Sequence, residues 1–298
     1  MPSERQTTEN VGFYAIHPSK ITHKFSEDLT DGVKVGLGLR QHEVEFIFAQ
    51  AKVQVSGFGF SKLTFGVEIE AYGFTRQSLI NAAAANALTV RSESYNHDDN
   101  ERYFKIVSDG SLQGENSNEV VSPILNGENG LNSLKTLCIA LASVGASVNR
   151  SCGLHVHIGA QGMSDQHYIR IFKNYQAIEQ AIDTFMAPSR RANNNGFCMR
   201  LQGMNFDRCQ TKTDVYDLFR SRYYKVNAHA WQRHHTVEFR QHQGTTDFTK
   251  IENWVRFLAK LVDYSFKHTC PVCRTIEEIP FLTSTEKQFF ISRRNALN

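Results

Sequence analysis

The chain has 298 residues, of which 41% are hydrophobic and 21% are charged, a composition typical of soluble globular proteins. Its formal net charge of +3 argues against a dedicated nucleic-acid-binding protein, which usually carries a strongly basic surface. It contains no apolar run of about 18 residues that could span a membrane, and its polar N-terminus lacks the apolar core of a secretory signal. Six cysteines are too few for a disulfide framework in a chain of this length. We therefore expect a cytoplasmic protein with no membrane partner.

The first part of the chain, residues 1–61, differs in pattern from the rest. After a polar start, apolar and polar residues alternate within segments 33–39, 43–48 and 52–60, and glycines separate the segments. This period of two is typical of half-buried antiparallel strands. We predict an N-terminal β-rich appendage over residues 1–61 and a catalytic domain over residues 62–298.

Strands and helices alternate from residue 63 onward, which predicts an α+β fold with an antiparallel sheet and packed helices. A polar, Asn-rich stretch at residues 189–213 predicts a loop or lid. The expected strands cover residues 63–72, 102–107, 119–125, 154–158 and 236–242. The expected helices cover residues 78–88, 131–144, 165–186, 251–268 and 284–297.

Three of the expected strands carry a pair of polar residues two positions apart. Such residues project to the same face of a strand, so neighbouring strands would gather these side chains on one face of a sheet. Unpaired charges are too costly to bury, so this face predicts a wet cleft in which cations neutralise the carboxylates. The three pairs are Glu68 with Glu70, His155 with His157, and Glu238 with Arg240.

Each pair also has a simpler interpretation. Glu68 and Glu70 could form a solvated strand face, and two alternating histidines are often surface residues. Glu238 and Arg240 could form an exposed ion pair that contributes only about 0–1 kcal/mol to stability. Asp109 and Glu119 flank a turn rich in Gly, Asn and Ser, which adds two carboxylates near the same strands. An oxygen-rich ligand set of this kind favours Mg²⁺ or Mn²⁺ over a structural zinc ion.

Five motifs in order over residues 62–268 resemble the amidoligase family, a branch of the glutamine synthetase and glutamate–cysteine ligase superfamily. The motifs are residues 66–70 (GVEIE), 108–111 (SDGS), 119–123 (EVVSP), 152–159 (CGLHVHIG) and 236–240 (TVEFR). The resemblance implies a glutamine-synthetase-like half-barrel that binds ATP and Mg²⁺ or Mn²⁺ and joins a carboxylate to an amine through an acyl phosphate.

The resemblance also implies roles for individual residues. The catalytic set comprises Glu68, Glu70, Glu119 and Arg240. The expected metal ligands are Glu68, Glu70, Asp109, Glu119, His155 and Glu238. The expected contacts to ATP phosphates are His155, Arg240, Arg190, Arg191 and Arg200.

Two other classes of function remain open at the sequence level. A metal-dependent hydrolase could use the same carboxylates and histidines without consuming ATP. A non-catalytic, nucleotide-binding member of the family would be expected to have lost metal carboxylates, and the motifs retain them. The expected partners are a small-molecule or peptide carboxylate and an amine; nucleic acid fits only as a substrate, and a homo-oligomer is allowed.

The segment that precedes the last motif contains Trp231, Arg233, His234 and His235. These side chains could stack on an adenine or on a substrate ring. A surface turn before the strand is the simpler interpretation, and it is the one we adopt from the sequence.

Overall fold

The computed structural model describes residues 63–94 and 102–297. Almost all of these residues belong to one compact unit, Gly59–Leu282 with Phe290–Asn298. The expected β-rich appendage over residues 1–61 lies outside the described residues, so the domain boundary near residue 62 stays a prediction.

The described strands form one eight-stranded sheet in the order β2-β3-β4-β1-β6-β8-β7, and β5 pairs with β1 beside this path. All neighbouring strands are antiparallel except β2 and β3, which are parallel. The strands are β1 (Thr64–Ala71), β2 (Val90–Ser92), β3 (Phe104–Val107), β4 (Asn118–Val121), β5 (Leu125–Asn126), β6 (Gly153–Gly159), β7 (Val226–Asn227) and β8 (Thr236–Gln243).

The central strand β1 shows why the two faces of the sheet differ. Phe65, Val67 and Ile69 are buried and alternate with Glu68 and Glu70 along the strand. Side chains two apart lie on the same face, so the apolar residues face the core and the two carboxylates face away from it.

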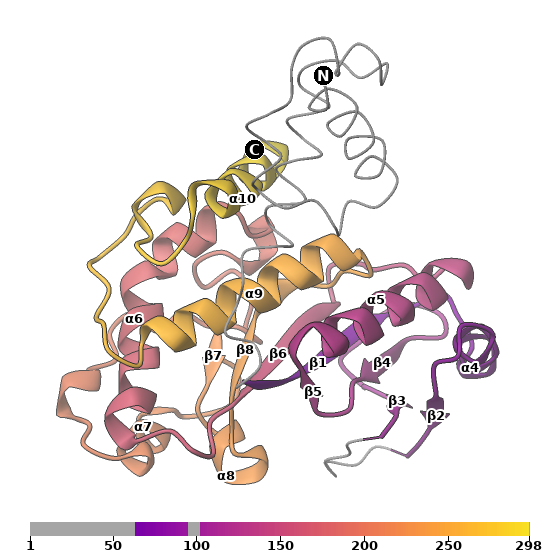
Figure 1. Cartoon of the computed structure of the whole chain (residues 1–298), viewed down its shortest axis with the longest axis horizontal. Coiled ribbons are helices and arrows are strands. Elements are labelled where there is room, and N and C mark those ends of the chain that lie inside the picture. Colours follow the sequence, from indigo (N-terminus) through magenta and orange to yellow (C-terminus); the bar gives the residue numbers. More distant parts are fainter. Residues whose placement is uncertain (1–62, 95–101, 298) are drawn as a thin grey trace, which may run out of the picture. The chain divides into compact units, whose positions relative to one another are not determined.

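Helices cover the apolar face of the sheet. In Figure 1, α5 and α9 cross in front of the central strands, and α9 packs against α5, α6 and β6. The described helices are α4 (Arg76–Ala85), α5 (Gly127–Ser143), α6 (Asp165–Thr184), α7 (Lys212–Leu218), α8 (Ala230–His234), α9 (Phe248–Tyr264) and α10 (Ser284–Leu297). Short 3₁₀ turns lie at Pro188–Arg190, Phe206–Arg208 and Ile276–Glu278.

Local signals in the sequence place several of these helices. The Ser164 hydroxyl accepts a hydrogen bond from the backbone N–H of His167 and caps α6, as its position before the helix predicts. On α9, the buried side chains include Trp254, Phe257 and Leu261, which form an apolar stripe along one side of the helix.

The α+β expectation is confirmed, and the differences lie in short elements. The stretch expected to be a loop contains two 3₁₀ turns and the beginning of α7. The strand expected at residues 119–125 is divided into β4 and β5, which both pair with β1. The strands β2 and β7 were not expected, because segments of three and two residues are too short to show a period.

Candidate active site

The register of the sheet brings the polar pairs of three strands onto one face. Glu68 of β1 lies opposite His155 of β6, and His157 of β6 lies opposite Glu238 of β8. Glu70 of β1 lies opposite Glu119 of β4. Residues that are up to 87 positions apart in the chain (155 − 68) therefore become neighbours across paired strands.

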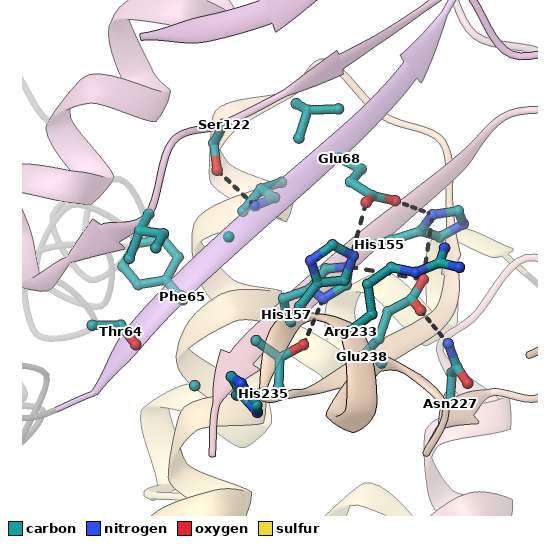
Figure 2. A pocket seen from close by; sticks show the side chains of 18 of the residues that line it. Thr64, Phe65, Glu68, Ser122, His155, His157, Asn227, Arg233, His235 and Glu238 are labelled. Carbon is teal, nitrogen blue, oxygen red and sulfur yellow. Dashed lines mark hydrogen bonds and ion pairs between the residues drawn. The ribbon is translucent and has the colours of Figure 1, made fainter. Parts of the chain in front are cut away.

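This face forms the floor of a cavity of about 1100 Å³. Figure 2 shows Glu68, His155, His157 and Glu238 converging on its centre, with Asn227 beside Glu238. A volume of this size is at the upper end of the range for small-molecule sites and can hold a nucleotide together with a second substrate.

Glu68 contacts both histidines of β6 in the cavity. Its Oε2 lies 2.8 Å from Nδ1 of His155, and its Oε1 lies 3.3 Å from Nε2 of His157. On the other side of His157, Nδ1 lies 2.9 Å from the hydroxyl of Thr236. That contact fixes the ring so that its Nε2 faces Glu68 and Glu238, and Nε2 has no hydrogen-bond partner.

Three overlapping groups of side chains could each hold a cation. Within each group the candidate ligand atoms lie within 4.8 Å of one another. Glu68 and Glu119 each belong to two groups, so the groups form one continuous cluster rather than separate sites. The groups are Glu68, Glu119 and His155; Glu68, His157 and Glu238; and Glu70, Asp109 and Glu119.

The pKa values of two carboxyl groups in this cluster, Glu119 and Glu68, are shifted in opposite directions. Burial raises the pKa of Glu119 well above its usual value, and the negative charges of Glu68, Glu70 and Asp109 raise it further. Burial also acts to raise the pKa of Glu68, but its interactions with the imidazoles of His155 and His157 outweigh burial and lower that pKa well below the usual value. Like charges therefore surround Glu119, whereas imidazoles lie beside Glu68.

The pair of Glu238 and Arg240 is buried, not exposed as the sequence interpretation assumed. Their residues are only 5% and 8% exposed, and a guanidinium N–H of Arg240 donates to Oε1 of Glu238. Burial acts to raise the pKa of Glu238, but the charge of Arg240 prevails and lowers it to about 2. The correction follows from position, because β8 lies inside the sheet between β6 and β7.

The three arginines expected to contact phosphate do not line this cavity. Arg190 is buried behind the start of β6, where its guanidinium donates to the carbonyl of Cys152. Arg191 donates to the carbonyl of Met186, and Arg200 faces Glu179. The basic side chains that line the cavity wall include Lys105, Arg222 and Arg233.

Sequence reasoning also missed part of the wall between α7 and β8. The segment expected to be a surface turn forms α8 and ends at His235, whose φ of 53° places it in the left-handed region. Arg233, His234 and His235 line the cavity, so the segment belongs to the site. The signal in the sequence was the closeness of Trp231, Arg233 and two histidines. Only the fold shows that this segment faces the cavity.

A largely antiparallel sheet gathers carboxylates, imidazoles and a buried guanidinium in one cavity, and these groups could hold divalent cations. A family model described as "Putative amidoligase enzyme" matches residues 61–262. The chain belongs to this amidoligase family.

Other comparisons add little to this assignment. A search of curated proteins finds no match. A solved structure entitled "Crystal structure of novel glutamine synthase homolog" is 12% identical, with a TM-score of 0.37; the match covers 79% of this chain and 62% of that chain. This chain thus corresponds to less than two thirds of that protein. Among the described helices, none has the length and hydropathy needed to cross a bilayer.

Proposed function

We propose that this amidoligase joins a carboxylate to an amine in the described cavity, with ATP and Mg²⁺ or Mn²⁺, through an acyl phosphate. The observation that carries the proposal is the continuous cluster of three cation-compatible groups in one cavity with a buried arginine. ATP carries several negative charges, which a cavity with this many carboxylates would repel unless cations were bound there.

The side chains fit divalent cations on two grounds. The buried Nε2 of His157 has no hydrogen-bond partner and faces the carboxylates of Glu68 and Glu238. Burial and the neighbouring carboxylates raise the pKa of Glu119, and a bound cation would counteract both effects. Carboxylate oxygens with few imidazole nitrogens suit Mg²⁺ or Mn²⁺. We assign the ligands to Glu68, Glu70, Asp109, Glu119, His155, His157 and Glu238.

A carboxylate is a poor electrophile, so it must be activated before an amine can attack it. In the proposed reaction, an oxygen of the substrate carboxylate attacks the γ-phosphorus of ATP, and the bond to the β–γ bridging oxygen breaks to release ADP. The amine nitrogen then attacks the acyl carbon, phosphate departs, and the nitrogen loses a proton. Bound cations supply charge neutralisation for the phosphate oxygens during the first step.

The residues of this chain orient the groups that react. Arg240 places a fixed positive charge beside Glu238, where charge develops on the transferred phosphoryl group. Lys105, Arg222 and Arg233 line the remaining wall and are suited to anionic parts of the substrates. The buried strands behind them hold these charges in place before the substrates bind.

The test is a reaction of the full chain with Mg²⁺, ATP and pooled carboxylates and amines. We expect ADP and phosphate as products, together with an adduct lighter than the two substrates by one water. Glu68→Gln should abolish ATP consumption, whereas Glu115→Gln, an exposed residue outside the cavity, should not. Release of AMP and pyrophosphate would mean an adenylating enzyme, and turnover without ATP would mean a metal-dependent hydrolase.

A further inference from the structure

The two-residue strand β7 places one amide side chain against the cluster of candidate cation ligands. Asn227 of β7 pairs with Glu238 of β8, is only 3% exposed and lines the cavity. None of the sequence motifs includes it. Pairing between two strands requires only backbone groups, so the sheet does not itself need an amide at this position.

Hydrogen bonds on both sides fix the orientation of this amide. Its Oδ1 accepts from the backbone N–H of His229 at 2.8 Å, and its amide NH₂ donates to Oε2 of Glu238. The reverse orientation would place a carbonyl oxygen against the carboxylate and an NH₂ group against another N–H donor. Figure 2 shows the amide directed at Glu238 from the side away from the histidines.

The contacts with Asn227 and Arg240 together fix the plane of the Glu238 carboxylate. Because Oε2 accepts from the amide, Oε1 is the oxygen directed at Arg240 and the histidines. Oε1 lies 3.8 Å from Nδ1 of His155 and 4.0 Å from Nε2 of His157. Without the amide, Arg240 would be the remaining hydrogen-bond donor to this carboxylate, and the last torsion of a glutamate, which has a broad range, would let its plane tilt.

The amide also connects the cluster to the wall of the cavity. The ring of His229, whose backbone holds Asn227, stacks on Tyr216 of α7 with centroids 4.2 Å apart. Both rings line the cavity, and Nε2 of His229 lies 3.1 Å from the carbonyl of Phe219. The segment between α7 and β8 is thereby connected to the Glu238 carboxylate by the Asn227 side chain, in addition to the strand pairing of β7 with β8.

We propose that Asn227 is a positioning residue that holds Glu238 in the orientation needed to bind a divalent cation. This inference rests on the proposed metal centre and adds to it a residue that touches no cation. Partners of this kind behind a ligand typically affect metal affinity by about 10–100-fold.

The test is a calorimetric titration of the full chain with Mn²⁺ alone, followed by thermal melts of the same samples. We expect Asn227→Ala to bind Mn²⁺ about 10–100-fold more weakly than the unaltered protein. Asn174→Ala is the matched control, because Asn174 is a fully buried asparagine with its own hydrogen bonds outside the cavity. It should lower the melting temperature and leave the Mn²⁺ affinity unchanged.

A double variant separates positioning from a general structural role. If Asn227 acts through Glu238, Asn227→Ala combined with Glu238→Gln should bind Mn²⁺ no more weakly than Glu238→Gln alone. Additive losses, or an Mn²⁺ affinity unchanged by Asn227→Ala, would overturn the inference while leaving the metal centre in place. Absence of Mn²⁺ binding by the unaltered protein would overturn both. If Asn227→Ala does not fold, Asn227→Ser, whose hydroxyl is too short to reach Glu238, replaces it in the same titrations.

Discussion

Glu119 of β4 is 7% exposed, and its carboxyl group lies near those of Glu68 and Glu70 on β1 and of Asp109 between β3 and β4. Burial and these like charges raise its pKa above the value it has in the unfolded chain. A raised carboxyl pKa favours the folded state at low pH, and this contribution is lost as pH rises through the folded pKa. Ionised Glu119 is therefore tolerated in the folded protein only at a cost, which a bound cation would offset.

We predict that Glu119→Gln stabilises the protein in EDTA and weakens its response to Mn²⁺. Between the unfolded and folded pKa of Glu119, its contribution to the free energy of unfolding falls with a slope of about 1.4 kcal/mol per pH unit. The pKa of His157 is also raised, so it adds a slope of the same sign, and comparing the variant with the unaltered protein isolates Glu119. Melting temperatures at pH 5 and pH 8 provide the measurement. A variant less stable than the unaltered protein at pH 8 in EDTA would contradict the prediction.

A second prediction at the residue scale concerns Arg240. Arg240→Lys keeps a charge beside Glu238 but loses the planar fork of donors, so we expect turnover to fall by about 10²-fold. Because the pair is buried, the melting temperature should also fall, unlike that of an exposed pair. Arg256→Lys is the control, since Arg256 is a buried arginine paired with Glu128 and Glu252 away from the cavity. It should lower the melting temperature alone, and normal ligation in Arg240→Lys would remove this residue from the catalytic set.

At the scale of elements, one buried lysine connects helix α6 to the segment that carries the site. Lys225 is fully buried, and its Nζ lies 2.9 Å from Oε1 of Glu179 and 2.6 Å from Oδ1 of Asp183, both on α6. Its carbonyl accepts a hydrogen bond from the backbone N–H of Arg240. Lys225 lies two residues before Asn227 in the chain. Its backbone hydrogen bond to Arg240 connects this segment to β8.

We predict that Lys225→Met lowers the free energy of unfolding by about 3–5 kcal/mol, because it removes the buried cation that pairs with both Glu179 and the half-buried Asp183. Lys173→Met is the matched control, since the partner of Lys173 is Asp207, whose side chain is 86% exposed. That variant should cost about 0–1 kcal/mol. Urea denaturation measures both, and similar losses in the two variants would show that the buried network contributes no more than a surface pair.

At the scale of the whole molecule, the cluster of candidate cation ligands includes side chains from β1, β4, β6 and β8. Because its ligands come together only when these strands pair, a cation that binds the cluster binds the folded chain in preference to the unfolded one. We predict that Mn²⁺ raises the melting temperature, with a stabilisation of about 2.7 kcal/mol at 100 times its dissociation constant. EDTA should reverse the shift. A melting temperature unaffected by millimolar Mn²⁺ would contradict the proposed centre.

The sequence by itself determined the features that depend on local periodicity and capping. Alternation along β1 placed Glu68 and Glu70 on one face, and the helix expected from residue 165 begins there as α6. The apolar stripe of α9 identified a core helix, and the expected helix at residues 284–297 has the observed bounds of α10. Each of these signals lies within a few residues of the feature it specifies, so no knowledge of distant partners is needed.

Only the tertiary structure decided which strands are neighbours and what their side chains meet. The burial of Glu238 with Arg240 depends on β8 lying inside the sheet, and the position of Arg190 behind β6 depends on the path of the chain after α6. His157 and Asn227 gain their contacts from strand register. A two-residue strand such as β7 has no period to read, and its pairing is set by packing between segments far apart in the chain.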